Sequence, residues 1–198
     1  ATTSTTGTFT PSALLQPGTR YSVAVSAKLA DGLPSTPFTS SFTTGAAVSI
    51  FAASVTPTTS TQTTSAITVG VKFSATTRYW ITGIKFYLPA NWTSTYTVSL
   101  WTSGGTKIAS GSGSPTSATA GWRTVNVTTP YRIAANTTYV ASVRALTGQY
   151  SSTPLAFVTS YTNGTMSVPA SGGVTASNDV FPNASSTTNY FVDVVAAP

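Results

Sequence analysis

Acidic side chains, on which both hydrolysis and calcium binding depend, are rare in this sequence of 198 residues. It contains no Glu, no His and no Cys, and its acids are Asp31, Asp179 and Asp193. A Ser–His–Asp triad and a zinc site built from His and Cys are therefore excluded. Glycoside hydrolysis normally takes two carboxyl groups that flank the scissile bond, and few are available here. We expect a protein that is not an enzyme.

Asp193 is the strongest candidate for a metal ligand, because it lies within an alternating apolar segment that ends at Val195. Calcium prefers hard oxygen ligands, and backbone carbonyl groups can complete a site that has few carboxylates. One hypothesis is therefore that Asp193 binds a structural calcium ion. The other is that its carboxylate pairs with a base such as Arg123 or Arg132, or accepts hydrogen bonds from a loop. The sequence leaves both open.

Trp80, Trp92, Tyr150 and Tyr161 are the candidate ligand contacts. Their neighbours in the sequence are Asn, Gln, Arg and Thr rather than the apolar residues of a strand. Exposed large aromatic side chains call for an explanation. Aromatic walls with a few well-placed polar groups are typical of ligand sites, and the C–H faces of sugar rings stack on such side chains. We expect these four rings on loops or on an exposed sheet face, where they would bind a polysaccharide.

The basic residues give the chain a formal net charge of +6, but its nine Lys and Arg are scattered singly. Proteins that bind nucleic acid concentrate such charges on one face, so no nucleic-acid partner is expected. Lys72 and Lys85 lie inside segments that alternate like strands. A covalent crosslink from either Lys would need a buried carboxyl such as Asp193. The alternation turns Lys72 away from Val71 and Phe73, which favours a solvated side chain.

The periodicity along the chain is that of strands, and no segment keeps a helical period. Residues rich in Val, Tyr, Phe and Thr alternate with polar residues between turns that contain Gly, Pro and Asn. The clearest alternating segments are 21–25, 67–73, 81–87, 96–100, 125–127, 139–145 and 190–194. Short strands at such spacing predict an all-β protein, an antiparallel, jelly-roll-like β-sandwich with almost no helix.

A boundary is predicted near residues 46–49, where Gly45-Ala46-Ala47 reads as a linker. Residues 1–45 should hold three strands, around Gly7–Thr10, Thr19–Lys28 and Ser40–Thr44. Three strands cannot bury both faces of a sandwich, so this segment should pack poorly by itself. Residues 50–198 should form the sandwich domain, with nine or ten strands.

The composition points to a secreted or cell-surface protein of bacteria. Thr and Ser account for 41 and 28 residues, and Cys is absent. Such polar, weakly charged chains are common among extracellular bacterial modules, and a protein without Cys does not depend on an oxidising compartment. No segment approaches the roughly 20 apolar residues of a membrane-spanning helix, so no membrane span is expected.

The segment from residue 49 to residue 195 resembles the bacterial domain-of-unknown-function family 4082. The residues that carry the resemblance are SIFAASVTP at 49–57, VGVKF at 69–73, ITGIKFY at 81–87, VSLWTSGGTKIAS at 98–110, GWRTVNVTTPYRIAANTTYVASV at 121–143 and FPNASSTTNYFVDVV at 181–195. Trp101 and Trp122 lie within these motifs and are expected to pack in the core. The resemblance implies a β-sandwich similar to carbohydrate-binding modules, in a large secreted protein with neighbouring domains.

Residues 1–45 resemble the second, C-terminal half of a bacterial Ig-like domain. The marks are the F-T-P turn at 9–11, the L-x-P-G-T-x-Y corner at 15–21, the turn at Asp31-Gly32 and the closing S-F-T-T at 41–44. The resemblance implies that the first half of such a domain is missing from these residues.

Two functions remain as hypotheses. The first is a non-catalytic module that binds a polysaccharide or another glycan. The alternative is a structural spacer or cell-surface adhesion module without a small ligand. Two or more exposed aromatic side chains in one concavity would favour binding, whereas buried or scattered rings would favour a spacer.

Overall fold

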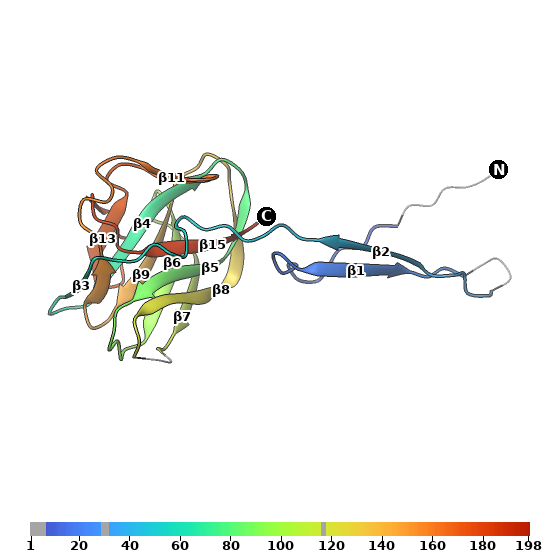
Figure 1. Cartoon of the computed structure of the whole chain (residues 1–198), viewed down its shortest axis with the longest axis horizontal. Coiled ribbons are helices and arrows are strands. Elements are labelled where there is room, and N and C mark those ends of the chain that lie inside the picture. The colour runs from blue at the N-terminus through green and yellow to red at the C-terminus, as the bar shows by residue number, and fades with distance from the viewer. Residues whose placement is uncertain (1–6, 29–31, 116–117) are drawn as a thin grey trace. The chain divides into compact units, whose positions relative to one another are not determined.

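The computed structural model describes residues 7–28, 32–115 and 118–198. Asp31 lies outside these residues, and so does the first residue of the turn predicted at Asp31-Gly32. The chain divides into two compact units (Figure 1). The smaller unit ends at Ala47 and includes Pro198, and the larger unit comprises Val48–Ala197.

The smaller unit is a β-hairpin. Strands β1 (Arg20–Val25) and β2 (Phe38–Thr43) pair in antiparallel register, and the large apolar side chains of both are exposed. The prediction of a strand around Gly7–Thr10 is wrong, because these residues are exposed and form no strand. The reason is that, among the described residues, β2 is the only strand that pairs with β1. The assignment to half of an Ig-like domain stays a prediction.

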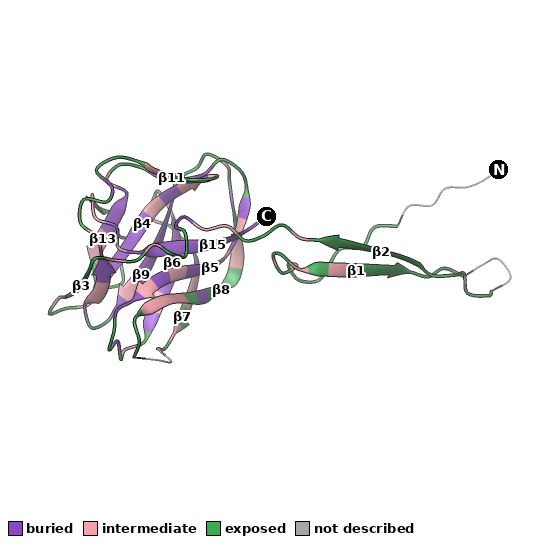
Figure 2. Ribbon diagram, in the orientation of Figure 1, coloured by how far each residue is buried: buried purple, intermediate pink, exposed green. Residues whose placement is uncertain are grey.

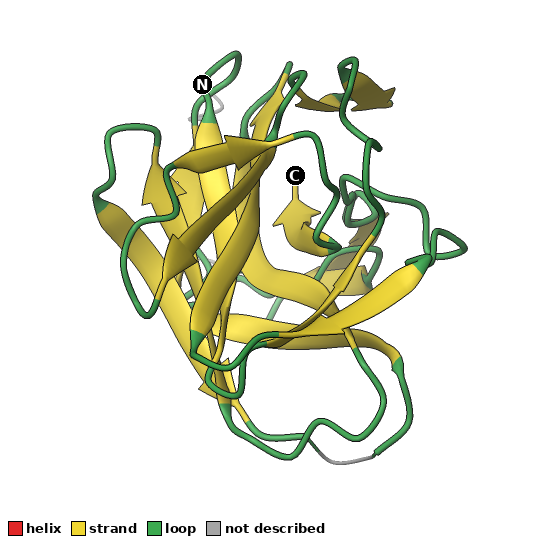
Figure 3. Cartoon of the chain, turned by 90° about the vertical axis from the view of Figure 1, so that its left-hand side faces the viewer, coloured by secondary structure: helices red, strands yellow, loops and turns green. Residues whose placement is uncertain are grey.

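The larger unit is built from strands throughout (Figure 3). They are β3 (Thr59–Gln62), β4 (Ile67–Ala75), β5 (Tyr79–Leu88), β6 (Tyr96–Thr102), β7 (Lys107–Gly113), β8 (Gly121–Ile133), β9 (Tyr139–Ala145), β10 (Gln149–Ser152), β11 (Tyr161–Asn163), β12 (Met166–Val168), β13 (Gly173–Ser177), β14 (Ala184–Ser186) and β15 (Val192–Ala197). The long strands follow the predicted alternation. The alternation does not reveal β11, β12 and β14, because three residues are too few to show a period.

These strands form an antiparallel β-sandwich, as predicted. An eight-stranded sheet has the order β11-β12-β4-β9-β6-β7, with β13 and β14 joined to it through β4. A three-stranded sheet has the order β15-β5-β8, and β3 and β10 form a small separate sheet. All of the strand pairs are antiparallel.

The core is formed by side chains from the inner faces of the two larger sheets, and the buried positions run along their strands (Figure 2). On β4 the buried apolar residues are Val69, Val71 and Phe73, and on β5 they include Ile84 and Phe86. Successive side chains of a strand point to opposite faces, so the residues between them lie on the outer face of each sheet.

The described ranges contain strands, turns and irregular segments but no helix. Within these ranges, no helix therefore has the length and hydropathy that a membrane span requires.

Candidate functional site

The structure does not gather the four predicted aromatic residues into one site. Trp80 is half-buried on β5, where the Arg132 guanidinium lies 5.9 Å from its ring centroid. Tyr161 on β11 packs against Phe51, with ring centroids 5.5 Å apart. Within the described part of the chain, no aromatic contact joins any two of the four predicted residues.

Tyr150 is half-buried on β10 and meets the Tyr190 ring edge-on, with centroids 5.6 Å apart. Burial and the neighbouring Tyr190 raise the pKa of the Tyr150 phenol above its ordinary value. The Tyr150 phenol therefore stays neutral near pH 7, and its ring packs against Tyr190.

Trp92 does not lie on an exposed surface, which corrects the prediction for this residue. Only 3% of it is exposed, and its ring contacts Phe86 and Tyr96 in the core. Its Nε1 donates a 2.6 Å hydrogen bond to the carbonyl oxygen of Ser94. The indole is thus buried with its polar atom satisfied inside its own loop, and it offers no ring face to a ligand.

Asp193 lies at the centre of a buried cluster on the outer face of the three-stranded sheet. Its side chain is fully buried, and its Oδ2 lies 3.0 Å from the Nζ of Lys85, which is directly opposite on β5. Oδ1 accepts hydrogen bonds from the backbone N–H of Ile50, at 2.6 Å, and of Val194, at 2.7 Å. Oδ2 also accepts a longer bond from Phe51 N–H, at 3.3 Å. Burial raises the pKa of Asp193, while the Lys85 ammonium and the backbone N–H groups oppose the rise.

This donor set is unfavourable for calcium, and the hypothesis of a structural calcium ion at Asp193 stays a prediction. Both carboxylate oxygens face N–H or ammonium donors, whose positive ends would repel a cation. The described residues also contain no cluster of three or more acidic, His or Cys side chains. Nor does Asp193 pair with the predicted bases: Arg123 donates to backbone carbonyl groups, and Arg132 lies over Trp80.

The melting temperature of the protein is therefore expected to be the same in excess EDTA and in millimolar calcium. A metal bound to the native state alone would raise stability by mass action. Thermal unfolding followed by tryptophan fluorescence in the two buffers tests this. A melting temperature that rises with calcium concentration would contradict the assignment of Asp193 to an ion pair.

Residues 48–55 are docked on this same outer face, and we call them the docked segment. Val48 exchanges two backbone hydrogen bonds with Ala196, at 2.8 and 2.9 Å. The Phe51 side chain contacts four aromatic rings, and the Val55 carbonyl accepts from the indole N–H of Trp122 at 3.1 Å. The rings around Phe51 are Trp122, Phe157, Tyr161 and Phe191. These aromatic contacts and hydrogen bonds hold the docked segment against the outer face of the three-stranded sheet.

The outer face of the eight-stranded sheet is covered differently, by residues 178–183, which we call the covering loop. Its Phe181 ring packs on Trp101 of β6, with centroids 5.7 Å apart, and on a small apolar cluster separate from the main core. Asn178 accepts hydrogen bonds from the Thr68 hydroxyl and, at 2.6 Å, from the Arg144 guanidinium. These contacts hold the loop across the face of the sheet.

A pocket of about 190 Å³ opens on this face beside Phe181. It is lined by Lys72, Ser103, Thr138, Val140, Phe181 and Asn183. Lys72 comes from β4 and its Nζ donates a 2.6 Å hydrogen bond to the hydroxyl of Ser185. The Asn183 side chain is exposed and makes no hydrogen bond within the described ranges. The pocket therefore combines an aromatic wall, an ammonium group, an amide and two hydroxyl groups.

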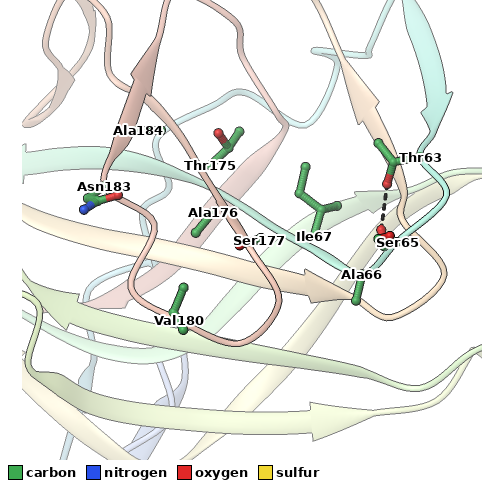
Figure 4. A pocket seen from close by; sticks show the side chains of 10 residues that line it. All are labelled: Thr63, Ser65, Ala66, Ile67, Thr175, Ala176, Ser177, Val180, Asn183 and Ala184. Atoms are coloured by element: carbon green, nitrogen blue, oxygen red, sulfur yellow. Dashed lines mark hydrogen bonds between the residues drawn. The ribbon is translucent and has the colours of Figure 1, made fainter.

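A wider groove of about 530 Å³ lies at the other end of the covering loop, toward the start of β4 (Figure 4). Small side chains line it, with Thr175 and Ala176 of β13 between the 63–67 segment and Asn183. Thr63 closes its own turn by donating to the Ser65 carbonyl at 2.7 Å. Asn183 borders both the groove and the pocket, so the two hollows adjoin along the loop.

Sequence reasoning missed Phe181 and Asn183 as site residues. Phe181 lies two residues after the loop Ser177-Asn178-Asp179, and an aromatic residue so close to a polar loop could have indicated a binding site. The orientation of Lys72 away from the core was predicted by the alternation of its strand. What the sequence could not show is that a loop 109 residues further on folds over the same face to meet it.

One protein family has a sequence model that matches residues 52–192, and its description is "Domain of unknown function (DUF4082)". The matched range contains all the residues of the pocket. The matched range begins one residue after Phe51 and ends one residue before Asp193. The Asp193 cluster on the other outer face therefore extends beyond both ends of the range. None of the curated proteins compared with the chain matches it.

Proposed function

Because this chain belongs to the DUF4082 family, whose description assigns no function, we propose one from the pocket itself: the larger unit is a non-catalytic carbohydrate-binding module. The pocket beside Phe181 is the observation that carries this proposal. An aromatic wall with convergent polar groups suits a sugar, whose C–H face stacks on a ring and whose hydroxyl groups exchange hydrogen bonds. The Ser103 and Thr138 hydroxyls and the Asn183 amide supply both donors and acceptors.

The carboxyl groups of the larger unit support a binding role over a catalytic one. Asp193 is fully buried and occupied by Lys85 and three backbone N–H groups. Asp179 pairs with Lys107 at 3.6 Å. Neither carboxyl lines the pocket. A pair of carboxyl groups flanking one glycosidic bond, as glycoside hydrolases use, has no counterpart among the described residues.

A spacer or adhesion module remains the second candidate, and the scattered positions of the four predicted rings favour it. Trp80, Trp92, Tyr150 and Tyr161 each pack against a different internal partner. In either case we propose that the protein is secreted or displayed at a bacterial cell surface, on the strength of its Thr- and Ser-rich, weakly charged composition.

Affinity electrophoresis through gels that contain single polysaccharides tests the binding proposal. We expect at least one polysaccharide to retard the wild-type protein. Phe181→Leu keeps an apolar side chain on Trp101 but removes the flat ring, so it should weaken retention about tenfold, equivalent to about 1.4 kcal/mol. Val158→Ala, an exposed apolar residue outside the pocket, is the matched control and should behave like the wild type.

Thermal unfolding of each variant shows whether the fold is intact. If no polysaccharide retards the wild-type protein, the spacer takes the place of the binding module. If Phe181→Leu, still folded, is retarded as strongly as the wild type, the binding site lies elsewhere.

A further inference from the structure

We propose that the pocket beside Phe181 selects sugars that carry an anionic group, a carboxylate or a sulfate, and that Lys72 binds this group. The inference rests on the proposed function and names the class of ligand for the same site. It is argued from the single hydroxyl partner of the Lys72 ammonium, the positive charge around Lys72 and the place of Lys72 in the pocket lining.

Lys72 differs from the other two Lys residues on strands of the larger unit. Lys85 pairs with Asp193 at 3.0 Å, and Lys107 pairs with Asp179 at 3.6 Å. Lys72 is partly buried, yet its ammonium has only a hydroxyl as partner, and no carboxylate pairs with it in the part of the chain that the structure describes. An ammonium group has three donors, so two of them remain for a ligand.

The surroundings of Lys72 are also positive. Arg144 lies on the same outer face, opposite Thr68 of β4 and about 13 Å along the strand from Lys72. Its guanidinium bonds to the neutral Asn178 amide, and its buried Nε has no partner. Lys72, Arg144 and Lys107 all lie near the covering loop, whose Asp179 pairs with Lys107 alone of the three. A face with this imbalance attracts anions.

The pocket suits a glycan better than a nucleic acid, which is also an anion. Single-stranded nucleic acid binds to a basic groove with several aromatic rings on which successive bases stack. Here one ring, Phe181, borders the pocket, and the adjoining groove is lined by small side chains. One ring, one ammonium and several hydroxyl groups match a single acidic sugar of a chain.

Affinity electrophoresis with matched polysaccharides tests the inference. The probes are polygalacturonate, alginate, hyaluronan and chondroitin sulfate, the same four with their carboxyl groups reduced to alcohols, the last also desulfated, and neutral dextran and xylan. The variants are Lys72→Gln and, as a control with the same loss of charge, Arg78→Gln, because Arg78 is exposed in the turn before β5. A single-stranded DNA oligonucleotide is included as a second polyanion.

We expect at least one acidic polysaccharide to retard the wild-type protein, and its neutralised form to retard it at least fivefold less. Lys72→Gln should lower retention by a similar factor, Lys72→Arg should restore part of it, and Arg78→Gln should leave it unchanged. Melting temperatures confirm that the variants are folded.

Three results would overturn the inference. Retention by neutral polysaccharides that depends on Phe181 but not on Lys72 would leave the carbohydrate-binding proposal standing and remove its anionic selectivity. Equal retention by DNA, with equal losses in Lys72→Gln and Arg78→Gln, would show attraction by net charge alone. No retention by any polysaccharide would overturn the proposed function itself.

Discussion

Replacing Asp193 by Ala is expected to lower the free energy of unfolding of the larger unit by about 3 to 5 kcal/mol. The change removes the ion-pair partner of Lys85 and leaves the N–H groups of Ile50, Phe51 and Val194 without their acceptor. Removing one member of a buried pair is costly because the other charge stays behind in a poorly solvated place, and each orphaned buried N–H adds to the loss.

Urea denaturation at pH 7, followed by tryptophan fluorescence, measures this loss. The four Trp residues lie between positions 80 and 122, so the signal reports on the larger unit alone. Asp179→Ala is the matched control, because the side chains of Asp179 and Lys107 are 39% and 36% exposed. Solvent screens such a pair, and its loss should cost less than about 1 kcal/mol. Equal effects of the two substitutions would show that the Asp193 cluster is not a stabilising element.

Phe51→Ala is expected to cost a similar amount, about 3 to 5 kcal/mol. The Phe51 side chain is 2% exposed, and its ring centroid lies 5.5 to 6.5 Å from those of four other aromatic rings. Truncation therefore removes aromatic contacts and leaves a cavity under the docked segment. The same urea titration measures the change.

Val158→Ala serves as the control for this second substitution, since Val158 is 59% exposed and its truncation should change stability by less than about 0.5 kcal/mol. A loss below about 1 kcal/mol in Phe51→Ala would mean that the docked segment is not part of the folding unit. Residues 48–51, which precede the range matched by the family, would then be dispensable for the sandwich.

The long strands could be predicted because their signal is local. In β4 and β5 the apolar residues of 67–73 and 81–87 alternate, and the buried positions of the structure follow that alternation. A period of two requires only neighbouring residues, and the same reasoning placed Lys72 on the outer face.

The site could not be predicted in the same way, because its contacts join distant parts of the chain. The partner of Asp193 is set by the register of β15 on β5, which places it opposite Lys85 rather than beside Arg123 or Arg132. For Trp92, a polar sequence suggested an exposed loop. Asn91 instead adopts a positive φ of 60°, and the loop returns the indole to the core against Phe86 and Tyr96.

The pairing of Val48 with Ala196 determines how much length the larger unit adds to a chain that carries it. The two residues exchange backbone hydrogen bonds, so the chain enters and leaves the unit at neighbouring points. Paired residues of antiparallel strands lie about 4.5 to 5.5 Å apart, whereas residues 48–197 fully extended would span about 500 Å. Within any longer chain, the folded unit would therefore add only a few ångströms to the distance between the segments on its two sides.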